Sequence, residues 1–142
     1  MVTGPGEQLE RELAVLLRRS RAISREVARS VHPDLESEAY SLLVRLDDTG
    51  DARPSDLAAF FGIGKPTLSR QVQMLERLGL VERTADPTDG RAVRLTLSPT
   101  GLERVHAARQ ARRERLRERL RDWSQDDIAQ LAGLVGRLNA SL

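Results

Sequence analysis

Residues 64–97 read GKPTLSRQVQMLERLGLVERTADPTDGRAVRLTL, and this stretch decides the fold. Its first part places Leu68, Val72, Leu75 and Leu78 at steps of four, three and three, which predicts one buried stripe on a helix over 65–78. Gly79 suits the end of that helix because glycine accepts a left-handed backbone without strain.

The second part of the stretch predicts a two-stranded ribbon. Val81–Ala85 and Ala92–Leu97 flank a loop over 86–91 that contains Pro, Asp and Gly, the residues typical of a tight turn. In the later strand, apolar and polar residues alternate, the period of a strand that buries one face. A helix followed by such a ribbon is the second half of a winged helix.

The residues just upstream supply the first half. Pro54–Phe61 predicts a shorter helix with Pro54 tolerated in its first turn, and Gly62-Ile63-Gly64 forms the connection. Two helices joined by a tight glycine-containing turn are a helix-turn-helix. The fold class we predict is therefore mainly α with a small β-wing, an α+β winged helix-turn-helix with six helices.

Beside the apolar stripe, the helix over 65–78 carries hydrogen-bond donors and small hydroxyls. A helix with such a second face can read base edges and contact phosphates in the major groove of duplex DNA. The candidate contacts on this helix are Lys65, Thr67, Ser69, Arg70, Gln73 and Arg77. On the ribbon we add Arg91, which has little packing use at a tip, and Arg94, which could reach a phosphate. A solvated turn is the alternative for Arg91, and an ion pair is the alternative for Arg77.

The composition excludes several classes of protein. The chain has 142 residues, a net charge of +2, 31% charged residues and no cysteine, which excludes disulfides and thiolate zinc sites. His32 and His106 are too isolated in sequence to predict a metal site, and no nucleophile–base arrangement predicts an enzyme or a cofactor. No apolar run predicts a membrane span or a signal peptide, so we expect a cytoplasmic protein.

The remaining helices have apolar stripes that extend beyond the winged helix. We expect residues 1–6 to form a flexible tail, a helix over 7–31, a helix after a cap at Asp34, a helix opened by Ser98-Pro99 and a last helix capped by Ser124. Unsheltered stripes would leave a large apolar patch, so we predict a two-fold homodimer, with an intramolecular bundle as the alternative. The predicted dimerisation residues are Leu9, Leu13, Leu16, Leu116, Leu120, Ile128, Leu131, Val135 and Leu138. A single domain over 7–142 would then divide into dimerisation helices over 7–33 and 99–142 and a winged-helix region over 34–98.

Several motifs resemble the MarR (multiple antibiotic resistance regulator) family of winged-helix repressors. The resemblance covers nearly the whole chain and rests on Ser55-Asp56-Leu57-Ala58, Pro66-Thr67-Leu68-Ser69-Arg70, Leu75–Arg83, Asp86–Arg91 and Leu97–Gly101. It implies a homodimer that binds a palindromic operator in double-stranded DNA, with Pro66 and its neighbours in the major groove. It also implies that Arg91 enters the minor groove, that Asp89 orients Arg91, and that a small phenolic or aromatic anionic effector releases the DNA.

Two positions depart from the family pattern. Gly64 stands where a Ser or Thr cap is common, and Gly90 stands where a second basic residue is common at the wing tip. The wing contribution would then rest on Arg91 alone. The alternative function is a winged-helix module for protein interaction or DNA architecture that recognises no specific operator.

Overall fold

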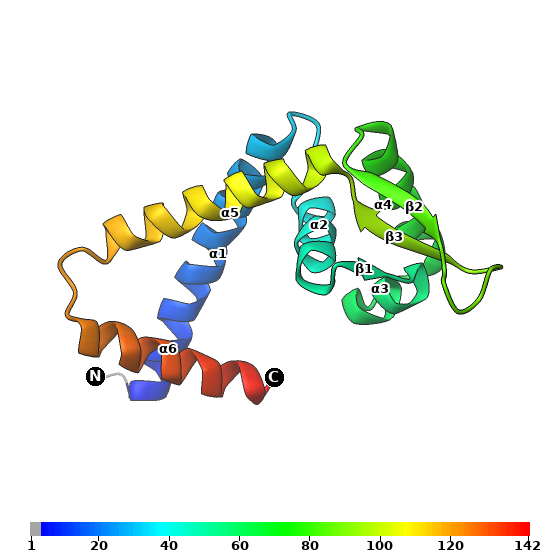
Figure 1. Cartoon of the computed structure of the whole chain (residues 1–142). Coiled ribbons are helices and arrows are strands. Elements are labelled where there is room, and N and C mark those ends of the chain that lie inside the picture. The colour runs from blue at the N-terminus through cyan, green and yellow to red at the C-terminus, as the bar shows by residue number, and fades with distance from the viewer. Residues whose placement is uncertain (1–3) are drawn as a thin grey trace. The chain divides into compact units, whose positions relative to one another are not determined.

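The computed structural model describes residues 4–142, which form six helices and three strands (Figure 1). The helices are α1 Pro5–Val31, α2 Ser37–Thr49, α3 Pro54–Phe61, α4 Lys65–Arg77, α5 Pro99–Arg119 and α6 Gln125–Ala140. The strands are β1 Asp51–Ala52, β2 Val81–Ala85 and β3 Val93–Leu97. The chain divides into one compact unit that ends at Ala108 and a second that spans Arg109–Leu142, so α5 begins in one unit and ends in the other.

The first unit contains the predicted winged helix, which confirms the fold class. Strands β2 and β3 pair in antiparallel register from Val81 opposite Leu97 to Ala85 opposite Val93. The sheet order is β1-β3-β2, since the two-residue strand β1 pairs with the other edge of β3. Strand β1 was not predicted, because two residues are too few to show a period.

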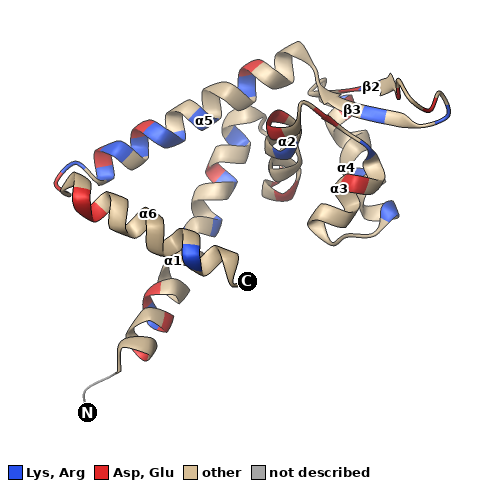
Figure 2. Ribbon diagram, turned by 60° about the horizontal axis from the view of Figure 1, so that its bottom comes forward, with Lys and Arg blue, Asp and Glu red and all other residues tan. Residues whose placement is uncertain are grey.

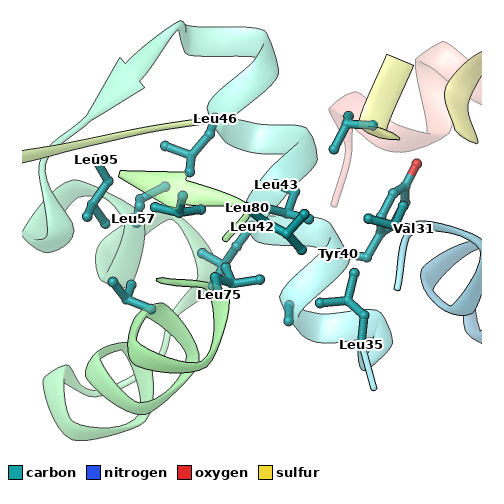
Figure 3. Close-up of a cluster of buried hydrophobic side chains, with 14 of the residues drawn as sticks. Val31, Leu35, Tyr40, Leu42, Leu43, Leu46, Leu57, Leu75, Leu80 and Leu95 are labelled. Atoms are coloured by element: carbon teal, nitrogen blue, oxygen red, sulfur yellow. The ribbon is translucent and has the colours of Figure 1, made fainter. Parts of the chain in front are cut away.

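Leucine side chains from α2, α3, α4 and the sheet make the core of this unit. Leu42, Leu43 and Leu46 of α2 meet Leu57 of α3 and Leu95 of β3, and all five are at most 2% exposed (Figure 3). Burying each leucine contributes about 1.5–3 kcal/mol relative to leaving it in water. Leu68, Val72 and Leu75 are also buried, so the predicted stripe of α4 faces this core and its polar face is left outward.

Glycines and caps end or begin the helices largely as predicted. Gly62 and Gly79 adopt positive φ angles of 64° and 73° after α3 and α4. Ser98 begins α5, because its Oγ accepts a hydrogen bond from the Gly101 amide at 3.0 Å. Ser124 caps α6 in the same way, with its Oγ 3.1 Å from the Asp127 amide.

Two predicted helix starts were wrong. The predicted tail over 1–6 extends too far, since α1 begins at Pro5, where the missing proline N–H would be unsatisfied in any case; residues 1–3 lie outside the described residues. Asp34 does not cap α2, whose N-cap is Glu36. The Asp34 amide instead donates to His32 Nδ1 at 3.1 Å, and the Leu35 amide donates to the His32 carbonyl, which closes a separate turn before α2.

Candidate nucleic-acid interface

The outward face of α4 collects the predicted contacts. Pro66, Ser69, Arg70, Gln73 and Arg77 are all exposed and follow one another at steps of one, three or four residues, so they occupy one side of the helix. Lys65 at the first helical position is also exposed, whereas Thr67 is half-buried. None of the basic residues among them makes an ion pair with another described residue within 4 Å. Their donors are available to a ligand.

The wing loop between β2 and β3 presents Arg91 to solvent. Every residue from Pro87 to Arg91 is exposed. The Asp89 carboxylate accepts a hydrogen bond from the Arg91 backbone amide at 3.1 Å. Asp89 therefore shapes the backbone at the tip and contacts no guanidinium atom of Arg91 within hydrogen-bond distance.

The buried Asp86 side chain joins the wing loop to Arg53, the residue before α3. One of its oxygens, Oδ2, accepts from Arg53 Nε at 2.8 Å and from Arg94 Nη1 at 3.4 Å. The other, Oδ1, accepts from the Thr88 hydroxyl at 2.7 Å and from the amides of Thr88 and Asp89 at 2.9 and 3.2 Å. The Asp86 side chain is 0% exposed, and these donors offset the cost of its desolvation.

These donors lower the pKa of the Asp86 carboxyl well below its ordinary value of 3.8. The side-chain and backbone hydrogen bonds from Thr88 contribute most, followed by the hydrogen bond from Arg53. Similarly, the hydrogen bond from Arg94 lowers the pKa of Asp51. Both groups are therefore ionised carboxylates at neutral pH.

Arg94 lies inside this network and not on an open surface. Its Nη2 donates to Asp51 Oδ1 at 2.7 Å while Nη1 contacts Asp86, and the two carboxylates raise its pKa. From the sequence alone, Arg94 was expected to reach a phosphate. Because both ends of its guanidinium are engaged by carboxylates, we leave it out of the proposed DNA contacts.

Sequence reasoning missed Arg53 as a participant in this site. It precedes α3 and reaches Asp86, which lies 33 residues further along the chain. The only local signal was the Asp86-Pro87-Thr88-Asp89 sequence, since an Asp at this place accepts bonds from amides two and three residues on. That local sequence predicts the turn, but it does not identify Arg53 as the distant partner of Asp86.

Two cavities in the first unit lie beside functional elements. A cavity of about 370 Å³ lies between the starts of α3 and α4 and the start of β3, and Arg53, Ser55, Lys65 and Ser69 give it a polar wall. A cavity of about 610 Å³ lies between α1 and the start of α2. Its polar lining consists of three arginines, two glutamates and four serines, with Leu17 and Leu35 as apolar walls; the charged residues are Arg21, Arg25, Arg29, Glu36 and Glu38.

The predicted dimerisation residues remain at least partly exposed. Helix α6 contains no buried residue. Its apolar side chains Leu131, Leu134 and Val135 are 44%, 58% and 43% exposed. On α1, Leu9 and Leu16 are 53% and 60% exposed. Leu13, Leu120, Ile128 and Leu138 are half-buried and Leu116 is exposed. On helix α5, basic residues outnumber acidic ones (Figure 2), and Leu102 and Leu116 are exposed among them.

No helix among the described residues has the length and apolar character needed to cross a membrane. Within residues 4–142, no three His, Asp or Glu side chains come together as a metal site.

The helix-turn-helix, the wing and the outward polar face of α4 define a winged-helix protein. The MarR family model matches residues 35–93. The uncharacterized HTH-type transcriptional regulator YxaD of Bacillus subtilis is 36% identical over 135 residues, which cover 95% of this chain and 93% of that protein. The chain belongs to the MarR family of transcriptional regulators.

Solved structures show the same fold. FabT of Streptococcus pneumoniae, crystallised in complex with DNA, matches with a TM-score of 0.83 at 18% identity and covers 94% of each chain. A mutant of Escherichia coli MarR, complexed with operator DNA, matches with a TM-score of 0.67 at 18% identity. That match covers 96% of this chain and 99% of the E. coli protein.

Proposed function

We propose that the protein is a homodimeric repressor that binds a palindromic DNA operator and is released by a small anionic effector. The observation that carries this proposal is the exposed face of α4, where Arg70, Gln73 and Arg77 lie on one side of a helix whose other side is buried. Arginine pairs with guanine and glutamine with adenine through two hydrogen bonds each, so this face can distinguish bases in the major groove.

Arg91 would act in the neighbouring minor groove. It is exposed at the tip of the wing, and no described side chain within 4 Å neutralises its charge. A narrow A·T-rich minor groove has an enhanced negative potential that attracts a single guanidinium. The structures of FabT and of mutant MarR in complex with DNA support a DNA partner for this chain also.

The exposed apolar face of α6 supports the proposal of a dimer, in which a second copy of the chain would cover this face. An amphipathic helix gains little stability in water unless its apolar face is buried. A two-fold arrangement would bury Leu131, Leu134 and Val135 against the partner and would present two α4 helices. The half-sites of the operator should then lie about one helical turn apart, roughly 34–36 Å.

The cavity between α1 and α2 is the place that we propose for the effector. Three arginines at successive turns of α1 outnumber the two glutamates of the lining, Glu36 and Glu38, so the excess positive charge lies on the α1 side and would attract an anion there. The leucine walls suit an aromatic ring. A hydroxybenzoate is a suitable probe. It should release the operator from the wild-type protein but not from Arg25→Ala, whereas Arg18→Ala, outside the cavity, should respond as the wild type does.

The experiment that tests DNA reading begins with selection of bound duplexes from a random library. The selected sequence should be a palindrome, and affinity for it should fall steeply with salt. Arg91→Ala should weaken binding by about 1–3 kcal/mol without loss of the fold.

Arg19→Ala is the matched control for Arg91→Ala, because it removes the same charge from an exposed position on α1. The control should leave affinity almost unchanged. Selection of no common sequence would favour the alternative function, an interaction or architectural module.

A further inference from the structure

Four charged side chains of alternating sign join the wing to the start of the helix-turn-helix. Asp51 of β1 contacts Arg94 of β3, Arg94 contacts Asp86 of the wing loop, and Asp86 contacts Arg53 at the start of α3. The two strongest contacts, Arg94–Asp51 and Arg53–Asp86, are 2.7 and 2.8 Å long. Hydrogen bonds between charged partners at this distance are shorter and stronger than neutral ones.

Asp86 is the only buried residue in the wing loop. Pro87 to Arg91 are exposed, and Ala92 is half-buried. Backbone hydrogen bonds from Asp86 to Ala92 and from Ala92 to Asp89 close the loop on itself, but they do not connect it to α3 or α4. The Asp86 carboxylate is therefore the main contact that holds the loop against the helix-turn-helix, beside a weaker hydrogen bond from Arg53 Nη2 to the Thr88 hydroxyl at 3.4 Å. Nearer the base of the wing, Arg83 of β2 pairs with Glu76 of α4 at 2.7 Å, and this pair does not involve the loop.

We propose that Asp86, held by Arg53, is a positioning residue that fixes the wing relative to α4 and thereby places Arg91 for DNA binding. This inference rests on the proposed DNA function. It assigns no DNA contact to Asp86 itself, since the side chain is buried and acidic. Loss of the Asp86 carboxylate would change DNA affinity indirectly, because the wing loop could then move relative to the paired strands β2 and β3.

The core of the unit does not depend on this carboxylate. Leu80, Val81 and Leu95 anchor the ribbon to the leucine core, and β2 and β3 pair along their whole length. Asp86→Asn retains an oxygen for Thr88 but loses the charge that Arg53 and Arg94 share. We therefore expect a folded protein with a less ordered wing.

A double-mutant cycle on operator affinity tests the proposal. In the wild-type background, Arg91→Ala should cost about tenfold or more, the size of a lost groove contact. In the Asp86→Asn background, the same change should cost about twofold or less, because contacts coupled through one element are not additive. If Asp86→Asn only lowered the stability of the fold, Arg91→Ala would cost the same affinity in the Asp86→Asn background as in the wild type.

Asp47→Asn is the matched control background. Asp47 is also a largely buried carboxylate, with an oxygen 2.8 Å from His106 Nε2, but it links α2 to α5 and not to the wing. Arg91→Ala should keep its full cost there. If Asp86→Asn failed to fold, Arg53→Ala would replace it, since Asp86 then retains its Thr88 and Asp89 donors.

Two outcomes separate this inference from the proposed function. An equal cost of Arg91→Ala in the wild-type and Asp86→Asn backgrounds would overturn the positioning role and leave DNA reading by the wing intact. No cost of Arg91→Ala in the wild type would overturn both the positioning role and DNA reading by the wing, whereas the proposed DNA function itself fails only if selection yields no common sequence.

A spectroscopic readout complements the cycle. The chain has no cysteine, so Gly90→Cys provides a single site for a spin label, and a side chain at Gly90 would meet nothing within 4 Å. Asp86→Asn should make the label more mobile in the absence of DNA. An unchanged spectrum would contradict the positioning role.

Discussion

Gly101→Ala should be among the most damaging single-methyl additions in the winged-helix unit. Gly101 is buried in the first turn of α5, where a Cβ atom would lie 2.1 Å from the Leu80 carbonyl oxygen and 3.0 Å from the Leu80 carbonyl carbon. The obstructing atoms belong to the backbone, so no side-chain rotation can relieve the clash. The start of α5 and the turn after α4 would have to move apart.

The magnitude follows from the contacts at this place. Forcing a methyl group into a packed site costs about 1–3 kcal/mol, and occasionally more. Separation would also stretch the bond from the Ser98 amide to the Leu80 carbonyl, and the Ser98 hydroxyl bond to Gly79, at about 0.5–1.5 kcal/mol each. The higher helix propensity of alanine offsets at most about 1 kcal/mol of this loss. The net loss should therefore lie between about 1 and about 6 kcal/mol, with a central value of roughly 3 kcal/mol.

Urea unfolding at a fixed protein concentration measures this loss, because the stability of the proposed dimer would depend on concentration. The midpoint should fall with an unchanged slope, as expected when the unfolded state is unaltered. Gly6→Ala, in α1 with nothing within 4 Å of the added carbon, is the control and should be neutral or stabilising by at most about 1 kcal/mol. A Gly101→Ala protein as stable as the wild type would refute the close approach of α5 to Leu80.

Three further predictions concern the interface, acid stability and base reading. Leu131→Arg would place a charge in the proposed dimer interface and should give single chains in sedimentation, whereas a persistent dimer would place that interface elsewhere. The lowered pKa of Asp86 stabilises the fold above its ordinary value of 3.8, and this contribution is lost as pH falls from there toward the lowered value. The stability difference between wild type and Asp86→Asn should thus be constant from about pH 7 to 5 and shrink below about pH 4; a difference that grows on acidification would contradict this. Arg70→Ala should cost about 1–3 kcal/mol of operator affinity and relax the sequence preference at one position, which repeat selection from the random library would detect.

Local patterns in the sequence predicted the helices and the wing because their causes are local. The spacing of Leu68, Val72 and Leu75 reports which side of α4 is buried, and the structure buries that side. Ser98 and Ser124 also act within three residues of their own positions. The polar face of α4 was predictable for the same reason, since it is the remainder of the helix after the stripe is removed.

The ionic network at the wing was not predictable because its partners are distant in sequence. Arg94 reaches Asp51 over 43 residues, and Arg53 reaches Asp86 over 33. One sequence alone shows that Arg94 projects from a strand, and a phosphate or a carboxylate would satisfy it equally well. Only the pairing of β1 with β3 brings Asp51 beside it.

The mass of the complex formed on a selected duplex tests the account most directly. We expect sedimentation to give two chains on each duplex, with binding lost when about five base pairs are inserted between the half-sites, because half a helical turn moves one half-site to the opposite side of the DNA. One chain on each duplex, with affinity insensitive to the insertion, would contradict paired reading by two copies of α4.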